Sequence, residues 1–284
     1  MVNGDILINL ANNIGKTNHI SKMVPIEKRS YSEIKEFCEK IRQENECIFY
    51  RGTKVPYLLP SIVPKKNNLD IIHLLKIEKK LLKAFKNIYP HKFDCDEVTK
   101  DWLYRIRARE HELASRLTDW SHIFYKALDF ATKYLKSSDE YGYLWVLPMN
   151  GNEVVPFSDF RNYPIESIST SYMLRGVNYG KDNALAPHRQ FVQGGNFLIQ
   201  SPYLITTTLN KQPLFSNKLI CIKIPATNVC DIRNDIIKYE HEDINQDLMI
   251  EKENYIDIVC NSLNDKLLNS VNNKIGNYLK TANP

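Results

Sequence analysis

An arginine followed by a glycine is the first place in this chain where the residue types suggest chemistry. Residues 48–50 form an apolar run that predicts a short buried strand, and Arg51, Gly52 and Thr53 follow it directly. A guanidinium at the end of a strand can hold an anionic group over a cleft. We expect Gly52 to turn the chain or to let a ligand approach the backbone. The alternative is a structural arginine paired with Asp119.

A second polar stretch combines hydroxyls, a guanidinium, a carboxylate and an indole: Ser115, Arg116, Thr118, Asp119, Trp120 and Ser121. It predicts a polar loop, and the apolar spacing after it predicts a helix over about 122–135. Hydroxyls and an aromatic ring can steady a planar ligand. Trp120 is expected in the core or as a pocket wall, and Arg116 either binds phosphate or pairs with an acid. The two serines have no adjacent His–Asp pattern, which argues against a serine hydrolase.

The third stretch, residues 189–199, contains the paired glycines Gly194 and Gly195 and runs into an apolar strand. Gln193 presents an amide just before them, which can form hydrogen bonds but carries no charge. His188 lies beside this stretch, and His111 precedes the second one. Each histidine is expected to be a satisfied, half-buried side chain, with a general base as the alternative.

Composition excludes several classes of protein. The chain has 284 residues, 43% of them apolar, and a net charge of +5, a mild excess that does not imply nucleic-acid binding. The six cysteines form no C-x-x-C pair, so reduced thiols in a cytoplasmic protein are expected. We find no signal peptide, no apolar run long enough for a membrane span, no nucleotide-binding glycine motif and no metal-ligand spacing.

Helices and short strands are expected to position these groups. The predicted strands are 47–50, 142–148 and 219–224, and the predicted helices are about 32–44, 70–89, 95–113, 122–135, 231–239 and 255–279. We expect an N-terminal extension over residues 1–29, with one short strand, and one α+β domain over residues 30–284 with a helical C-terminal end. An irregular insertion of loops and short helices, able to form a lid, is expected at about 149–186.

Three motifs in this order resemble the FRG domain family, named for a Phe-Arg-Gly motif. They are Tyr50-Arg51-Gly52, then the segment from His111 to Ser121 with the helix motif Ala127-Leu128-Asp129-Phe130-Ala131, then Gln193-Gly194-Gly195-Asn196-Phe197. The family's middle motif reads His-Gly-Leu-Pro-Thr-Arg-Leu-Leu-Asp-Trp-Thr. The resemblance covers about residues 30–250, which is nearly the whole of the expected domain.

The chain departs from the family pattern at several positions. Tyr50 stands where the family has phenylalanine, Glu112 where it has glycine, and Ala114 where it has proline. Thr118 replaces a leucine, and Gly194 replaces the second glutamine of the third motif. The changes at the glycine and the proline are expected to alter the loop geometry of the middle motif.

A more distant resemblance connects the same motifs to ADP-ribosyltransferases. Those enzymes carry an aromatic residue followed by Arg or His and Gly, then a hydroxyl motif before an Ala-x-x-Phe-Ala helix, then a glutamate leading into a strand. This resemblance implies a split, mostly antiparallel β-sheet core flanked by helices, with NAD as the substrate. It implies that the NAD-binding residues are Tyr50, Arg51, Gly52, Thr53, Ser115, Arg116 and Trp120. It implies that the catalytic residues are Arg51, Asp119, Ser121 and Gln193.

The third motif lacks the expected acid, because Gln193 replaces a glutamate. A carboxylate would stabilise an oxocarbenium-like transition state, so either catalysis is lost or Asp119 or Glu112 supplies the charge. Two other triplets spell transferase motifs, Ser169-Thr170-Ser171 and Glu240-His241-Glu242. Neither has the expected helix or strand behind it, and we expect neither to be the true motif.

The resemblance therefore implies an NAD-dependent ADP-ribosyltransferase or a degenerate relative, acting as a bacterial toxin or phage-defence effector. Its acceptor would be a protein or a nucleic acid, and an antitoxin or regulatory partner is an added expectation. No metal and no membrane are expected to take part. The alternative is a non-catalytic module that uses the same cleft to bind a nucleotide or a partner.

Overall fold

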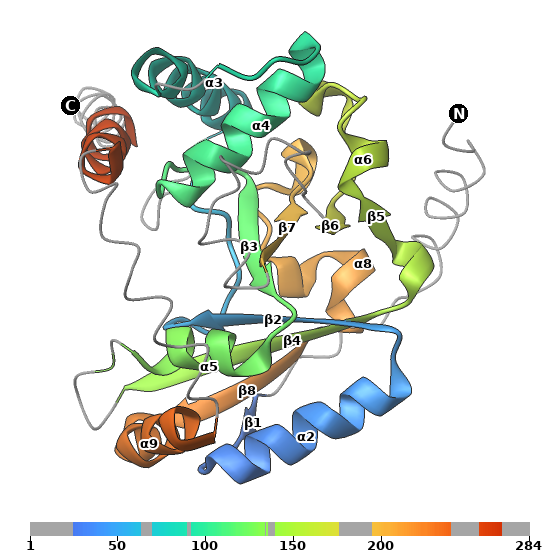
Figure 1. Ribbon diagram of the computed structural model, residues 1–284, viewed down its shortest axis with the longest axis vertical. Coiled ribbons are helices and arrows are strands. Elements are labelled where there is room, and N and C mark those ends of the chain that lie inside the picture. Colours follow the sequence, from blue (N-terminus) through green and yellow to red (C-terminus); the bar gives the residue numbers. More distant parts are fainter. Residues whose placement is uncertain are drawn as a thin grey trace, which may run out of the picture.

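The computed structural model of this chain describes residues 25–63, 70–89, 92–133, 135, 140–175, 195–239 and 256–268. The strands are β1 (Ile26–Glu27), β2 (Cys47–Thr53), β3 (Leu117–Ser121), β4 (Tyr141–Met149), β5 (Val154–Pro156), β6 (Tyr172–Arg175), β7 (Gly195–Ile199) and β8 (Ile220–Pro225). The helices are α2 (Tyr31–Glu44), α3 (Ile71–Ile88), α4 (Glu97–Glu110), α5 (Phe124–Thr132), α6 (Phe157–Phe160), α8 (Pro213–Ser216), α9 (Val229–Tyr239) and a helix over 256–268 (Figure 1).

The strands form one sheet in the order β1-β8-β4-β2-β3-β7-β6-β5. The β1–β8 and β5–β6 pairs are parallel and the other five pairs are antiparallel. This arrangement confirms the expected α+β class with a mostly antiparallel sheet.

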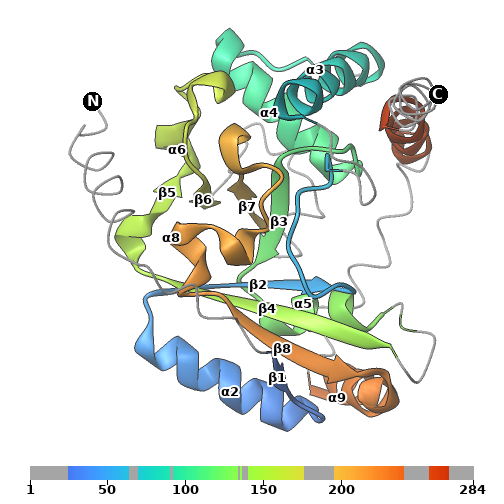
Figure 2. The ribbon, with the colours of Figure 1, turned by 180° about the vertical axis from the view of Figure 1, so that it is seen from behind.

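The sheet consists of two parts that we call the lower half-sheet (β1, β8, β4, β2) and the upper half-sheet (β3, β7, β6, β5). Within the lower half, β2 pairs with β4 along its whole length, from Cys47 to Thr53. Between the halves, β2 and β3 pair at one position, Tyr50 with Ser121. Beyond that pair the strands separate, and Figures 1 and 2 show β3 running across the direction of β2. The sheet is therefore split at its centre.

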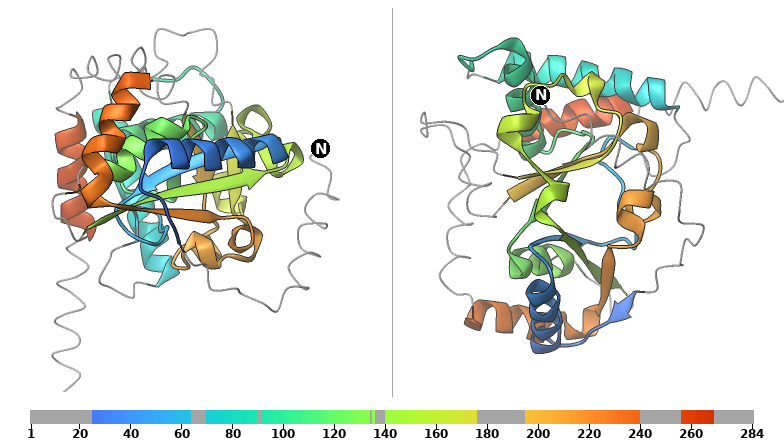
Figure 3. Two further views of the ribbon diagram at one scale, coloured as in Figure 1. Left: turned by 90° about the horizontal axis from the view of Figure 1, so that it is seen from below. Right: turned by 90° about the vertical axis from the view of Figure 1, so that its right-hand side faces the viewer.

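Each half-sheet has its own helical cover. Helices α2, α5 and α9 lie over one face of the lower half (Figure 3), where Ile34, Leu128 and Ile232 are fully buried. Trp102 and Ile106 of α4 pack with α6 against the upper half. Helix α3 packs on α4, and the helix 256–268 packs against both through Cys260 in the same hydrophobic cluster.

Local signals explain the helices. Ser30 caps α2 by accepting a hydrogen bond from the backbone N–H of Glu33, whose side chain accepts one from Ser30 in return. Asp70 caps α3 through the N–H of His73, as expected from the sequence. No helix in the described ranges is both long and apolar enough to cross a lipid bilayer.

The expected turn at Gly52 is wrong, because β2 continues through it to Thr53 and pairs with β4 there. The expected loop over residues 115–121 is also wrong from Leu117 onward. These residues form β3 and pair in register with β7, for example Asp119 with Phe197. Pairing with β4 outweighs the turn preference of Gly52, and pairing with β7 outweighs the polar composition of β3.

The irregular stretch after residue 149 contains the expected short helices, but it also supplies β5 and β6, which complete the edge of the sheet. Residues 176–186 of that stretch lie outside the described residues. The expected C-terminal helix is confirmed over 256–268, and its expected continuation lies outside the described residues.

Candidate functional site

A pocket of about 240 Å³ lies where the two half-sheets separate. Its wall comes from β2, β3, the start of β7, α5, the C-terminal end of α4 and the loop after α4: Tyr50, Arg51, Gly52, Arg109, Glu110, Glu112, Asp119, Trp120, Ser121, Lys126, Ala127, Phe130, Asn196 and Phe197. Three cationic and three anionic side chains are among them. The first two sequence motifs therefore meet in one cavity.

Arg51 spans the split between the strands. Its Nη1 donates a short hydrogen bond to the backbone carbonyl of Asp119 and lies 3.8 Å from Oδ2 of the same residue. Burial lowers the pKa of Arg51 to about 10, and the nearby Asp119 carboxylate opposes that shift. The guanidinium is still charged at neutral pH, so the expected pairing with Asp119 is present and the role as a ligand anchor stays a prediction. Arg51 pairs with Asp119 and also faces the pocket.

A second arginine shares the same carboxylate. Arg109, at the end of α4, donates from Nε at 3.0 Å and from Nη2 at 2.6 Å to Oδ2 of Asp119. The Asp119 side chain is 46% exposed, whereas those of Arg51 and Arg109 are 20% and 16% exposed. Two guanidinium groups around one carboxylate leave a local excess of positive charge at Asp119.

Gly52 is required by α5. A Cβ atom at this position would lie 2.1 Å from the carbonyl oxygen of Ala127 and 2.4 Å from the nitrogen of Ala131. The glycine therefore lets α5 lie directly on β2. Neighbouring residues of a strand point to opposite faces of the sheet. Arg51 therefore reaches across the split to Asp119, whereas Gly52 contacts α5.

The turn from β3 into α5 is held by Ser121, whose Oγ accepts a hydrogen bond from the N–H of Ile123 at 2.9 Å. Ser121 also lines the pocket. Trp120 is 2% exposed, and its Nε1 donates to Thr118 Oγ1 at 3.2 Å. Trp120 is thus a core residue with an edge at the pocket wall.

Phe130 and Asn196 are among the pocket residues that were not expected from the sequence. Phe130 of α5 is 45% exposed and presents an aromatic ring at the pocket. Asn196, next to the glycine pair of the third motif, is buried and pairs through its backbone with Trp120. The exposure of Phe130 could not be predicted from the sequence because it depends on the direction of α5.

The loop after α4 adds a strained residue. Glu112 lines the pocket with φ of 63°, and it is the one non-glycine residue with positive φ in the described part of the chain. A left-handed conformation costs a non-glycine residue roughly 1–2 kcal/mol. This conformation explains why a glycine suits the same position in the motif that the chain resembles.

Three expected binding residues lie outside this pocket. Thr53 donates to the carbonyl of Val55 at 2.8 Å and accepts from Trp145 Nε1 at 2.9 Å. Ser115 and Arg116 are buried and do not line the cavity. Gln193, the expected catalytic amide, lies outside the described residues.

Ser115 and Arg116 belong to a buried ionic cluster around Glu78. This carboxylate accepts from the Arg116 backbone at 2.8 Å and from Arg116 Nε at 2.9 Å, and Arg105 Nη1 lies 3.7 Å away. Burial opposes the charge on Glu78, but the two arginines and the backbone bond outweigh it and hold its pKa below the usual value. The cluster joins α3, α4 and β3.

The remaining expectations concern isolated groups. Ser171 donates from Oγ to Gln212 Oε1 at 2.9 Å and does not line the pocket, so the triplet that contains it is structural. His111 is 3% exposed and lies 2.7 Å from Asp257, as a satisfied histidine would. Residues 188 and 240–242 lie outside the described residues. All six cysteines are free of disulfides, and no group of potential metal ligands occurs in the described ranges.

Comparison with known proteins gives one finding. Residues 46–140 match the model of the FRG domain. No curated protein and no solved structure matches the chain. The matched segment begins just before β2 and contains α3, α4, β3 and α5, so it supplies every pocket residue except those of β7.

Proposed function

We propose that this FRG-domain chain is an NAD-dependent ADP-ribosyltransferase whose substrate site is the pocket at the split of the sheet. The observation that carries the proposal is the position of the three motifs. The described parts of these motifs include residues of β2, β3 and β7, which are consecutive neighbours in the sheet, and residues of all three strands line one cavity.

The side chains of the pocket suit parts of NAD. The positive excess around Asp119 favours an anionic group such as the diphosphate, which Arg51 and Arg109 would bind with charge-assisted hydrogen bonds. The exposed ring of Phe130 offers a surface for the nicotinamide. The volume of about 240 Å³ is below that of pockets which enclose drug-sized ligands, so it would accept a nucleoside-sized half of NAD.

A second candidate function is a non-catalytic module that binds a nucleotide or a protein partner. Arg51 and Asp119 bond to each other, and such an internal pair can be purely structural. The glutamine at position 193 adds no charge to the site. Under this proposal the pocket binds its ligand without chemical change.

Incubation of the protein with labelled NAD and bacterial lysate distinguishes the two. Transfer of label to a macromolecule, or release of nicotinamide, is expected from the wild type and not from Arg51→Ala. Arg51→Lys keeps the charge without the planar fork and is expected to lose at least ~10-fold. Arg29→Ala removes an arginine that is 72% exposed and serves as the matched control. A folded wild type that neither transfers label nor releases nicotinamide, but binds NAD, would favour the non-catalytic module.

The biological role is part of the same proposal. We infer a bacterial effector that acts in the cytoplasm as a toxin or in phage defence, modifying a protein or a nucleic acid, with an antitoxin or regulator as partner. Expression of the wild type, Arg51→Ala and Arg29→Ala in a bacterial host extends the same test. Growth arrest that requires Arg51 supports a toxic effector, and the labelled macromolecule identifies the acceptor class.

A further inference from the structure

We propose that Glu112 is the catalytic carboxylate of this pocket and that it accepts hydrogen bonds from the ribose hydroxyls of the bound dinucleotide. The inference deepens the proposed function and rests on it. It answers the question raised by the glutamine at position 193, because it names a different element, the loop after α4, as the source of negative charge.

The other two carboxylates of the pocket are engaged by arginines. Asp119 lies between Arg109 and Arg51, at 2.6 Å and 3.8 Å from the nearest guanidinium nitrogens. Glu110 lies 3.1 Å from Arg107. A carboxylate neutralised in this way has less capacity to stabilise positive charge on a substrate.

Glu112 differs from both. Within the described part of the chain it has no cation at ion-pair distance, and its Oε2 contacts the neutral amide of Asn261 at 3.4 Å. The side chain is exposed and lines the pocket. Its charge is therefore available to a ligand.

The backbone of Glu112 is held in a conformation that suits glycine better, with φ of 63°. This φ belongs to the C-cap of α4, where the N–H of Leu113 donates to the carbonyl of Ala108 at 2.8 Å. No ion pair in the described residues explains why a glutamate occupies this position. A ligand contact made by its side chain would explain it.

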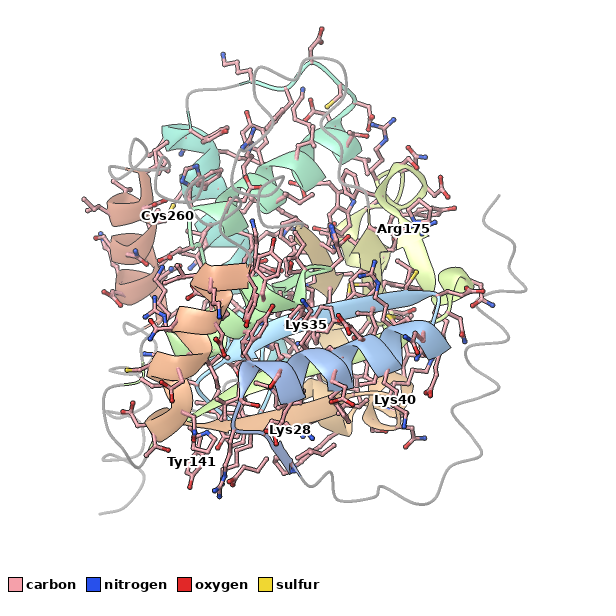
Figure 4. The ribbon with its side chains drawn as sticks, turned by 60° about the horizontal axis from the view of Figure 1, so that its bottom comes forward. Lys28, Lys35, Lys40, Tyr141, Arg175 and Cys260 are labelled. Atoms are coloured by element: carbon pink, nitrogen blue, oxygen red, sulfur yellow. The ribbon has the colours of Figure 1, made fainter. Side chains whose placement is uncertain are left out.

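The strained residue is also firmly fixed. Its N–H donates to the carbonyl of Arg109 at 3.0 Å, and its carbonyl accepts from Asn264 Nδ2 at 2.9 Å. Asn264 Oδ1 accepts from the N–H of Ala114 at 2.8 Å, so one side chain of the helix 256–268 bonds both sides of the loop. That helix packs beside α3 and α4 through the buried Cys260, which Figure 4 labels. Glu112 is thus pre-positioned without its ligand.

The chemistry requires one carboxylate and no further reagent. The bond between ribose C1′ and the nicotinamide nitrogen breaks, and its electron pair leaves with nicotinamide. A hydroxyl of the acceptor, or water, forms the new C1′–O bond and releases its proton to solvent. Glu112 stabilises the positive charge that develops on the ribose between these events by binding the ribose hydroxyls.

The test compares wild type, Glu112→Gln and Glu112→Gly with Glu97→Gln, a matched control at the exposed start of α4. Nicotinamide release and NAD binding are measured for each, together with thermal unfolding. Both Glu112 variants are expected to lose about 10²–10³-fold in nicotinamide release, as when one preorganised electrostatic group is removed. Glu112→Gly is expected to unfold a few degrees higher than wild type because the left-handed strain is relieved, which shows that lost activity is not lost folding.

Each result decides the proposal. An active wild type with a Glu112→Gln variant within about threefold of it overturns the role of Glu112 while the proposed function stands. If the wild type binds NAD without turnover, the proposed transferase function fails. In that case, NAD binding that is at least ~10-fold weaker in Glu112→Gln supports a contact between Glu112 and the ribose. Unchanged NAD binding overturns that contact. A wild type that does not bind NAD overturns both.

Discussion

Gly52 connects one residue to the geometry of the whole pocket. Its missing Cβ lets the backbone of α5 contact β2, and the same helix supplies Lys126, Ala127 and Phe130 to the cavity. Any side chain at this position must push the helix away from the strand. The pocket wall would then move with it.

We predict that Gly52→Ala destabilises the protein by about 1–3 kcal/mol, because the new methyl group would overlap backbone atoms that cannot rotate away. Denaturant unfolding measures this change. Gly151→Ala is the control, since its Cβ would meet the end of the Glu46 side chain at 2.8 Å, and a flexible side chain can move. Equal stability of the two alanine variants would contradict the packing role of Gly52.

At this scale the sequence identifies some site residues and misses others. Arg51, Asp119 and Ser121 were expected together and do line one pocket. Arg116 was expected near a ligand, but it pairs with Glu78 instead. The sequence pattern does not reveal this pairing because Glu78 lies 38 positions earlier in the chain. Glu112 was expected only as an alternative source of charge, and Phe130 was missed as a site residue because its exposure depends on how α5 packs.

Among the elements, the helix 256–268 has the least expected role. Its Asp257, Asn261 and Asn264 recur at helical spacing and all contact the loop from His111 to Ala114. A segment far along the chain therefore fixes the rim of a pocket built from earlier residues.

Asn264→Ala is expected to lower the free energy of unfolding by about 1–3 kcal/mol, because the Glu112 carbonyl and the Ala114 N–H both lose a partner. Hydrogen exchange of the Ala114 amide should rise in the same variant. Asn261→Ala removes only a 3.4 Å contact and should change stability by less than about 0.5 kcal/mol. A larger effect at Asn261 than at Asn264 would argue against this anchoring.

The longer elements were predicted well because periodicity and capping residues mark them. Helices α2 and α3 lie within a residue of their expected bounds. Strand β3 was missed because three of its five residues are polar, and β5 and β6 were missed because they span only three and four residues. Short strands are stabilised by their neighbours, which a local pattern does not contain.

At the scale of the whole molecule, the ionic cluster around Glu78 links acid stability to the site. Its folded-state pKa is held below the usual value of 4.5, so its contribution to stability is present above that value and is lost as the pH falls through the lower, folded pKa. Asp101, next to the cluster, is shifted in the same direction: burial opposes its charge, and Arg105 and Lys86 outweigh that effect.

We predict that the free energy of unfolding of the wild type falls as the pH drops below 4.5, the ordinary pKa of a glutamate. Glu78→Gln should be about 3–5 kcal/mol less stable at neutral pH, since two buried arginines lose their partner, and it should show a shallower fall in acid. Glu36→Gln, on the exposed face of α2, is expected to follow the wild-type curve. Urea titrations at several pH values measure all three, and parallel curves for wild type and Glu78→Gln would contradict the prediction.

The split sheet has a consequence for how such a site can diversify. The two half-sheets share one backbone pair, Tyr50 with Ser121, and one hydrophobic core in which Trp145 and Leu147 of the lower half pack with Trp120 and Leu198 of the upper half. A substitution in this shared core can therefore change the angle between the halves while the clusters under the separate helical covers stay packed. Because the pocket lies where the half-sheets separate, a change in the angle between them changes the shape of the pocket. Mutations at residues that do not touch the ligand can therefore alter which ligand is preferred.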